Sequence, residues 1–396
     1  MRAAPLALRP SRHDAARDRS VNLGIVQCVT MPLRKNGRAR VMYPALWDVN
    51  GEQDFIAHRD YSTVEAQRSR PGCGQFVKAL NGRVCNVLGL NAGLDTRIAE
   101  QAAELIMQRE NRMTEKKTGN KSHVAHHYVP KFLLKNWHAE SGKLIQYEWA
   151  SYGFDAREYT AKSVAKQDHL YSTISDLGEM DVSLEPDYFT AEVDTPAGAV
   201  LQKILSSGIS AINIEEREIW ARFLVAQLAR TPSMIDRFRN STEDFFEAGV
   251  EAIASQPGRS GFREYVRANA PNVTRNISLE ILPNVIEDPR LVQAIYSAHW
   301  RCVRLRWSKL DFLIGDRPLM HVGPLSSNFL MVLPLAPRIL FCAARNSQSI
   351  ESLMKANESS VVKTINKDTV RNAARYVYSK DHSHDALIRR RLARNT

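Results

Sequence analysis

Apolar residues recur at helical spacing through the middle of the chain, most clearly over residues 215–230. Apolar side chains return there every three or four positions, and acids occupy the first turn, where the helix dipole favours them. Thr231 and Pro232 follow, with the character of an N-cap and of a first helical residue. The pattern predicts one helix over residues 215–230 and a second that runs to about Ala254.

Helical spacing continues on both sides of this pair. Residues 185–204 have a helical pattern that contains Pro186 and Pro196, and a short apolar segment at residues 132–137 predicts one or two helical turns. Further helices are predicted at residues 263–270, 288–298, 359–366 and 369–378.

Strand-like alternation flanks the helical block. Before it, residues 144–149 and 158–164 are predicted to pair, with Tyr152 and Gly153 as turn material. After it, strands are predicted at residues 300–307 and 312–315, and a hairpin at residues 329–333 and 339–343 around residues 334–337. This order predicts an α+β fold, with a central helical block flanked by short antiparallel strands in a single domain.

The first 112 residues differ in composition from the remainder. They hold 15 Arg and 2 Lys, whereas residues 113–396 hold 23 Arg and 14 Lys. Only residues 94–107 of this early part have a helical pattern. Two interpretations are open. Residues 1–112 form an atypical or disordered extension, or the gene start is assigned too early and translation begins at Met113. In both, residues 113–396 form the α+β domain.

Hydropathy and cysteine content limit the cellular compartments in which the domain is expected. The longest apolar run, residues 329–336, spans eight residues and contains a proline, far short of the roughly 20 residues that a membrane helix needs. Five cysteines without a CxxC pair predict neither a disulfide framework nor a cysteine zinc site. We therefore expect a soluble, cytoplasmic protein without a membrane partner.

The net charge of +11 favours nucleic acid as a partner only weakly. Basic residues are spread along the chain, and the one compact cluster consists of Arg389, Arg390, Arg391 and Arg394 near the C-terminus. A fraying, charged chain end is the simpler interpretation of that cluster. The partner stays unassigned at this point, with nucleic acid as a weak candidate.

Two adjacent histidines, His126 and His127, precede Pro130. A neutral imidazole can ligate a metal ion or act as a base near pH 7. Adjacent side chains of an extended segment point to opposite sides, so one of the two is expected to face a site while the other packs or caps. The alternative is a histidine that fixes the turn before Pro130.

Asp316 stands directly after an apolar strand and shortly before Pro318. A strand end is rigid and open, which suits a catalytic or ligand-binding carboxylate. The same residues are also typical of an ordinary turn. Both interpretations have equal weight.

Gln227 and Arg230 lie on the apolar face of the helix predicted at residues 215–230. Polar groups on such a face need hydrogen-bonding partners. They could hold a substrate anion. The favoured alternative is structural, with Arg230 tethering a neighbouring segment through an internal ion pair with Asp194.

The stretch from His127 through Tyr128 and Pro130 to Trp137 resembles the opening of the family called domain of unknown function 4238, a group of uncharacterised bacterial proteins. The resemblance covers about residues 123–380. Later family features are an acid before a helix, a Gln-x-x-Arg-Thr-Pro stretch and a strand that ends in Asp-x-Pro. Their counterparts here are Asp194, residues 227–232 and residues 316–318, followed by a strand like that at residues 329–337.

Two departures from the family pattern are an Asp at position 194 in place of Glu, and Arg317 in place of a small polar residue. Neither breaks the match. The resemblance implies that His127, Arg230 and Asp316 converge on one site. It does not supply an activity.

Two functions from different classes fit these residues. The first is a metal-dependent hydrolase, nuclease-like, in which His127 and Asp316 are catalytic and hold a divalent metal ion. Residues 125–130 are similar to the first strand of His-Asn-His nucleases, but Asn136 and His138 are too close to serve as the downstream pair. The second is a non-enzymatic binding or sensor module, in which His126, Tyr128 and the other polar motif residues form a structural network.

The chain lacks the GxxxxGK[ST], GxGxxG, HExxH and GxSxG motifs. Nucleoside triphosphate hydrolysis, dinucleotide redox chemistry and zinc proteolysis therefore lose their usual signals. Metal content and phosphodiesterase activity would distinguish the hydrolase from the binding module.

Overall fold

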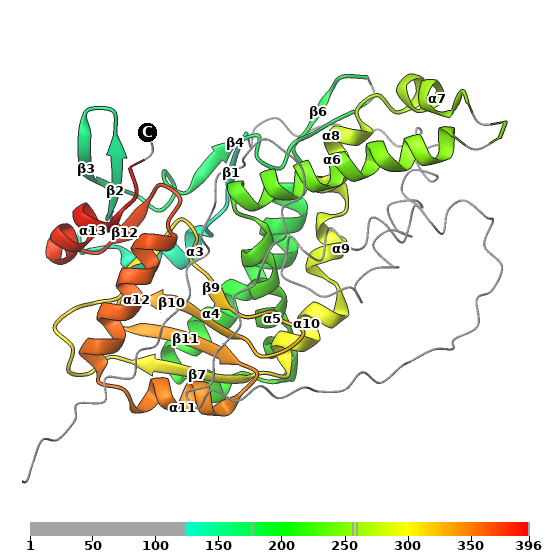
Figure 1. The fold of residues 1–396 in the computed structure, drawn as a ribbon. Helices are drawn as coiled ribbons and strands as arrows, with labels where there is room; N and C mark the ends of the chain where they lie inside the picture. Colours follow the sequence, from blue (N-terminus) through cyan, green and yellow to red (C-terminus); the bar gives the residue numbers. More distant parts are fainter. Residues whose placement is uncertain (1–123, 176, 256, 259, 395–396) are drawn as a thin grey trace, which may run out of the picture. The chain divides into compact units, whose positions relative to one another are not determined.

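Helices α5 (Ile214–Ala229) and α6 (Pro232–Ala254) form where the apolar periodicity predicts them (Figure 1). This computed structural model describes residues 124–394 apart from 176, 256 and 259. Helix α5 begins with a capping box, in which the side chains of Asn213 and Glu216 each accept from the other residue's backbone N–H. This reciprocal cap fixes the start of the helix that carries Gln227 and Arg230.

The helical segment before α5 contains an unexpected geometry. Its first part is a π-helix, η3 (Leu184–Asp194), which continues into α4 (Thr195–Ser207). The prediction of a helical segment over residues 185–204 is confirmed in its extent, but the α-helical spacing assumed for its first half is wrong. The change of period decides which of its side chains share a face.

Shorter helices complete the helical block. Two of them, near residues 263–270 and 288–298, were predicted, whereas α8 and α9 were not. In chain order they are η4 (Ile209–Ala211), α7 (Phe262–Asn269), α8 (Val273–Glu280), α9 (Leu282–Ile286) and α10 (Pro289–Tyr296).

The first four-stranded sheet is antiparallel in the order β7–β11–β10–β9. Its strands are β7 (His299–Arg304), β9 (Met320–Val322), β10 (Leu330–Ala336) and β11 (Ile339–Ala344). The predicted hairpin is confirmed, but Pro334 lies inside β10 and not in the turn. The sheet tolerates this proline because β9 pairs with β10 only as far as Val332 and the register shifts after Pro334.

The second four-stranded sheet has the order β3–β2–β12–β8. Its strands are β2 (Leu144–Ala150), β3 (Gly153–Tyr159), β8 (Ile314–Gly315) and β12 (Val377–Ser379). Strand β2 and the turn at Tyr152 and Gly153 form where they were predicted, but the partner strand begins at Gly153 and shares only Glu158 and Tyr159 with the predicted residues 158–164. Gly153 has a φ of 129°, which permits the tight turn directly before it.

The end of the chain differs from the prediction. One helix, α12 (Glu358–Asn372), covers the segment in which two helices were predicted, and residues 377–379 form strand β12 in place of a helix. Helix α11 (Ser347–Lys355) was not predicted. After η5 (His382–His384), helix α13 (Asp385–Arg391) contains Arg389, Arg390 and Arg391, and Arg394 follows its end.

The start of the described chain carries the His-Tyr-Val-Pro motif. Strand β1 (Ala125–His127) pairs with β4 (Lys166–Asp168), and α3 (Lys131–Leu134) with η2 (Lys135–Trp137) form the predicted helical turns. The indole of Trp137 is fully buried, and its Nε1 donates to the carbonyl oxygen of Phe312 at 2.9 Å. The motif is therefore joined to the strand that leads to Asp316.

Clusters of buried apolar side chains hold these elements together. A large cluster joins the helical block to the first sheet and to the motif. A smaller core joins the second sheet to α12 and α13 through Tyr147, Val370 and Ile388, among others. A further short ladder joins β5 (Thr173–Ile174) to β6 (Met180–Asp181). These observations confirm the α+β class.

Several expectations fall on residues outside the described range. They are the boundary near Met113, the helix at residues 94–107 and three of the five cysteines. Within the described residues, none of the helices combines the length and apolarity that crossing a bilayer requires.

Candidate functional site

His127 lies at the end of β1 and is buried. Its ring Nε2 is 3.1 Å from the carbonyl oxygen of Lys162, so this nitrogen carries the proton and donates. Burial lowers the pKa of His127 to about 4, and the neighbouring charges of Lys131 and Lys166 act in the same direction. The imidazole is therefore neutral at pH 7 and serves as a hydrogen-bond donor to the segment before β4.

His126 points to the other side of β1, as expected for an extended segment. Its ring is fully buried and stacks on Tyr171 with 5.4 Å between ring centroids. Its Nδ1 accepts from the backbone N–H of Tyr171 at 2.8 Å. Both histidines of the pair are thus held by the segment that follows β3.

Arg230 is the most deeply buried charged residue of the motifs, with no exposed surface. Its Nη1 donates to Asp194 Oδ1 at 2.7 Å, and its Nη2 donates to the carbonyl oxygen of His127 at 2.7 Å. The guanidinium also lies 4.6 Å from the centroid of the Phe189 ring. One side chain therefore ties the end of α5 to the π-helix and to β1.

The charge of Arg230 is stabilised by its neighbours. Burial alone would lower its pKa, but Asp194, Tyr171 and Glu185 together raise it above the ordinary value. The hydroxyl of Tyr171 also donates to the backbone oxygen of Arg230 at 2.6 Å. The ion pair with Asp194 is the structural tether that the sequence favoured.

Glu185 belongs to the same cluster, although the sequence did not single it out. It is 6% exposed, and its Oε1 accepts from the backbone N–H of His127 at 3.2 Å. Burial raises its pKa, and Arg230 opposes this effect. On an α-helix Glu185 and Asp194 would face opposite directions. At roughly 4.4 residues per turn of a π-helix they share a face.

Asp316 directs its carboxylate at the turn that precedes β12. Its Oδ1 accepts from the N–H of Ala374, and its Oδ2 accepts from those of Arg375 and Tyr376, at 2.7 to 2.9 Å. The residue is 4% exposed, and burial raises its pKa against the effect of these three donors. Asp316 thereby joins the end of β8 to the start of β12.

Tyr128 connects the two clusters through the chain. It is buried, and its hydroxyl lies close enough to Asp316 and Tyr378 that both influence its pKa, which burial raises. Its neighbour His127 belongs to the Arg230 cluster. Among the described residues, no hydrogen bond joins Asp316 directly to His127 or Arg230.

Gln227 lies one turn before Arg230 on α5 and is 2% exposed. No described group hydrogen-bonds to either atom of its side-chain amide. Among residues 124–394, no three His, Cys, Asp or Glu side chains come together in a group that could hold a metal ion. The two clusters are therefore rich in charge but are engaged mainly with the backbone of the fold.

The comparisons with known proteins give one match. The sequence profile of the family described as "Protein of unknown function (DUF4238)" matches residues 125–383, which is well over half of the chain. The chain belongs to the DUF4238 family. Neither the curated proteins nor the solved structures contain a match to it.

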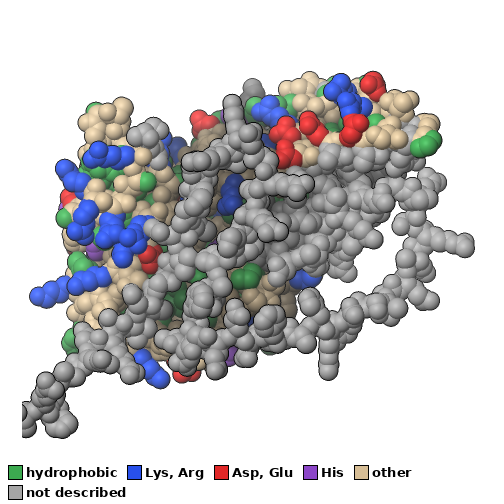
Figure 2. Space-filling model, viewed as in Figure 1, with side chains coloured by type: hydrophobic (Ala, Val, Ile, Leu, Met, Phe, Trp, Pro, Cys, Tyr) green, Lys and Arg blue, Asp and Glu red, His purple; other side chains and the backbone are tan. Residues whose placement is uncertain are grey.

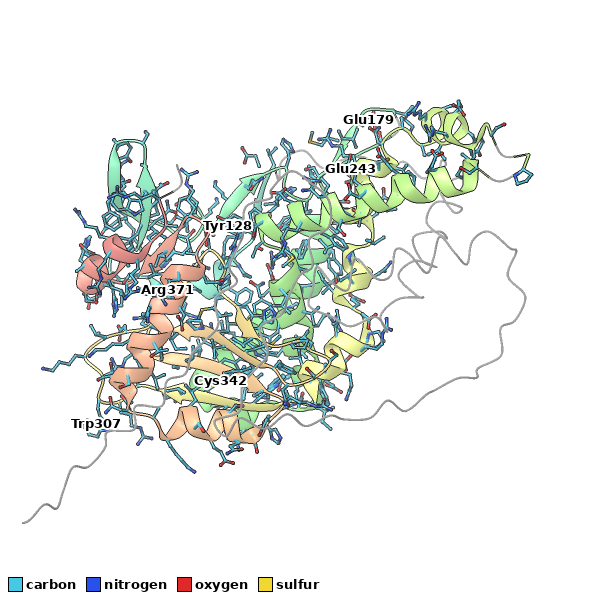
Figure 3. The ribbon with its side chains drawn as sticks, viewed as in Figure 1. Tyr128, Glu179, Glu243, Trp307, Cys342 and Arg371 are labelled. Atoms are coloured by element: carbon cyan, nitrogen blue, oxygen red, sulfur yellow. The ribbon has the colours of Figure 1, made fainter. Side chains whose placement is uncertain are left out.

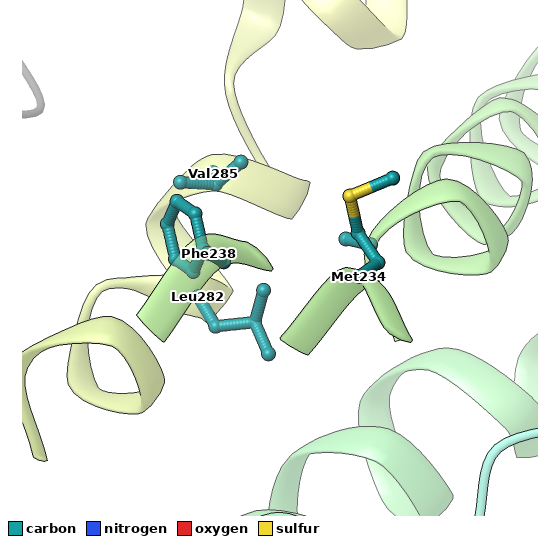
Figure 4. A pocket seen from close by; sticks show the side chains of 5 residues that line it. Met234, Phe238, Leu282 and Val285 are labelled. Atoms are coloured by element: carbon teal, nitrogen blue, oxygen red, sulfur yellow. The ribbon is translucent and has the colours of Figure 1, made fainter. Parts of the chain in front are cut away.

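A hollow lies between helices of this DUF4238 domain. It is lined by Ala229, Met234, Phe238, Leu282 and Val285 and has no room for a water molecule (Figure 4). Its walls are apolar and come from α5, α6 and α9. Such a space is typical of imperfect helix packing and not of a ligand pocket.

The buried His127 predicts a specific pH dependence for the DUF4238 domain. Its folded pKa of about 4 lies below the ordinary value of 6.5, so its contribution to stability is present above pH 6.5 and is lost as the pH falls towards 4. Between pH 7 and 4.5, wild type should lose about 2 kcal/mol more than His127→Gln, which cannot titrate. Urea unfolding at each pH measures this difference.

The exposed histidine of β7 provides the control for this experiment. His299→Gln makes the same substitution at a position that solvent reaches in the folded state, and it should leave the free energy of unfolding at pH 7 nearly unchanged. Parallel curves for wild type and His127→Gln would contradict the neutral, buried state of His127.

Proposed function

We propose that this domain is a non-enzymatic binding module whose family motifs fix the fold, while the ligand is recognised elsewhere on its surface. The observation that carries the proposal is the environment of Asp316. Both of its carboxylate oxygens already accept backbone N–H groups, three in all. A carboxylate in this arrangement stabilises a turn, and it has few free lone pairs left to bind a substrate or a metal ion.

The Arg230 cluster supports the same proposal. The guanidinium is fully buried and spans three elements, as expected for a tether. A ligand anion would have to displace Asp194 to reach it. Likewise, His127 donates its ring N–H to a backbone carbonyl and is neutral at pH 7.

A metal-dependent hydrolase built on His127 and Asp316 is the competing proposal. It requires that Asp316 release its backbone donors, or use its remaining lone pairs, to bind a divalent ion together with an imidazole. A hydrolase that takes the first of these routes would couple metal binding to a rearrangement of the turn before β12.

Metal titration of the full chain tests the two proposals against each other. Mn²⁺, Mg²⁺ and Zn²⁺ are titrated by calorimetry into wild type, His127→Ala and Asp316→Ala, and a generic phosphodiester is assayed beside each. The binding module predicts no stoichiometric binding that depends on these residues. It also predicts a lower melting temperature for both variants, because each loses buried hydrogen bonds.

Matched surface changes complete the design. Asp236→Ala and His299→Ala remove exposed groups of the same kinds and should leave the melting temperature nearly unchanged. Stoichiometric metal binding that both His127→Ala and Asp316→Ala abolish, in proteins that stay folded, would overturn the proposal in favour of the hydrolase.

A further inference from the structure

The C-terminal part of the chain carries a local excess of positive charge. Residues 358–394 hold nine Lys or Arg against four Asp or Glu. On α12, Lys363, Lys367 and Arg371 follow one another at four-residue spacing, which places them on one side of the helix. The helix of 15 residues is about 22 Å long at ~1.5 Å per residue, so the row is extended.

The arginines of α13 continue this charge and do not fray. Ile388 and Leu392 are buried in the smaller core, beside Val370 of α12. The indole Nε1 of Trp149 donates to the carbonyl oxygen of Leu392 at 3.1 Å. The interpretation of this cluster as a fraying chain end is therefore wrong, because Ile388 and Leu392, on either side of Arg389, Arg390 and Arg391, anchor the segment to the second sheet.

Aromatic rings hold two of these arginines in place. The guanidinium of Arg389 lies 4.9 Å from the ring centroid of Phe154, and that of Arg394 lies 4.3 Å from Trp149. No described carboxylate is within ion-pair distance of Arg389, Arg390 or Arg394. A ring orients a guanidinium without neutralising it, so the charge stays available to an anion.

At the other end of α12, Trp307 is held out into solvent with 86% of its surface exposed. Glu358, the first residue of α12, accepts from the backbone N–H groups of Arg306, Trp307 and Ser308 at 2.8 to 3.1 Å. Arg338 donates to the carbonyl oxygens of Leu305 and Ser308 on the same loop. The loop is thus fixed from two sides while the indole that it carries stays exposed.

We propose that these elements form one surface that binds single-stranded nucleic acid. The basic-aromatic surface consists of Lys363, Arg371, Arg389, Arg390, Arg394 and Trp307. Figure 3 shows Trp307 and Arg371 towards opposite ends of α12, and Figure 2 shows Lys and Arg side chains gathered over the region of α12, α13 and the β2–β3 hairpin. The inference rests on the proposed function and names the ligand class that the binding module would take.

The charge and the rings select this ligand together. A row of cations follows a phosphate backbone, and exposed aromatic faces stack on unpaired bases. Besides Trp307, Tyr152 at the tip of the β2–β3 hairpin is 67% exposed, and Arg157 lies over its ring. Bases of a duplex are already stacked on each other and could not use these faces.

Fluorescence anisotropy of a labelled 20-nucleotide oligo-dT with the full chain tests the inference at 50 to 200 mM KCl. Lys363→Glu/Arg371→Glu should weaken binding at least tenfold. It should also make the slope of log K against log salt shallower by roughly 1.4, at about 0.7 per single-strand phosphate contact. Trp307→Ala should weaken binding about fivefold or more with little change of slope, because stacking is not ionic.

The double variant Arg237→Glu/Arg267→Glu is the matched control. It makes the same change of net charge on exposed positions of α6 and α7 and should alter the affinity less than twofold. An equal loss in this control would overturn the inference, since binding would then follow net charge alone. Tighter binding to duplex DNA of the same length would overturn it as well.

Two further arms separate this inference from the proposed function. The inference about the basic-aromatic surface is overturned if the chain binds vesicles of anionic phospholipid but not oligo-dT, or if it does not bind oligo-dT at 50 mM KCl. Either result leaves the outcome of the metal experiment unaffected. Binding through the surface together with metal-dependent cleavage that Asp316→Asn abolishes supports the surface and contradicts the non-enzymatic proposal.

Discussion

Replacing Arg230 with methionine should lower the free energy of unfolding by about 3–5 kcal/mol, the range seen when one partner of a buried ion pair is removed. The substitution leaves the carboxylates of Asp194 and Glu185 without their shared counter-charge and the carbonyl of His127 without its donor. Methionine keeps much of the volume beside Phe189, so the loss reports on charge and hydrogen bonding more than on packing. Chemical denaturation measures the change.

A control variant and a compensating variant show whether this loss comes from the buried ion pair. Arg239→Met removes a partly exposed arginine that pairs with Asp236 at 3.5 Å and should cost less than about 1 kcal/mol. Adding Asp194→Leu to Arg230→Met should recover part of the loss, because one uncompensated carboxylate is removed. A loss below about 1 kcal/mol for Arg230→Met itself would show that the cluster does not stabilise the fold.

Asp316→Ala should be the second severe substitution, with an expected loss of about 3–5 kcal/mol. It leaves the N–H groups of Ala374, Arg375 and Tyr376 without their acceptor in a mostly buried turn, at about 1–3 kcal/mol for each group that stays unsatisfied. Asp316→Asn keeps one acceptor oxygen and should cost about half as much. Equilibrium unfolding in urea measures both losses.

Hydrogen exchange gives this prediction a local readout. In Asp316→Asn, the amides of Ala374, Arg375 and Tyr376 should exchange faster, whereas those of α5 should change little. Asp236→Ala, which removes an exposed carboxylate from α6, is the control and should change neither set. Unchanged protection at residues 374–376 in Asp316→Asn would contradict the role assigned to Asp316.

The parts of the fold that depend on local pattern could be predicted from the sequence. Helices α5 and α6 follow from apolar spacing together with the Thr231-Pro232 start, and strand β2 with the turn after it follows from alternation that ends before a glycine. These signals lie within one element or across one turn. They need no knowledge of distant residues.

Strand β12 shows where local pattern fails. Residues 369–378 have helical spacing, and α12 does extend into them as far as Asn372. The helix ends there for two reasons. The carboxylate of Asp316 accepts a hydrogen bond from the backbone of the next turn, and the residues after that turn pair as β12 between β2 and β8. That outcome depends on a carboxylate more than 50 residues earlier in the chain, which periodicity cannot report.

The sequence likewise predicted some contacts of the candidate site and not others. The pairing of Arg230 with Asp194 could be inferred from a polar residue on an apolar helix face and an acid that the family resemblance marked. Glu185 escaped notice because α-helical spacing separates it from Asp194, whereas the π-helix brings both to Arg230. The catalytic roles predicted for His127 and Asp316 stay predictions that the metal experiment addresses.

The position of β12 has a consequence for the order of folding. Tyr147 on β2 hydrogen-bonds to the backbone of Asp381, and 234 residues of chain separate them. During synthesis β2 can pair with β3 at once, but its other edge must wait until nearly the whole domain has left the ribosome. Closing so long a loop is slow, and an unpaired strand edge invites association with other chains. The nascent domain is therefore most exposed to misassembly just before its last strand arrives.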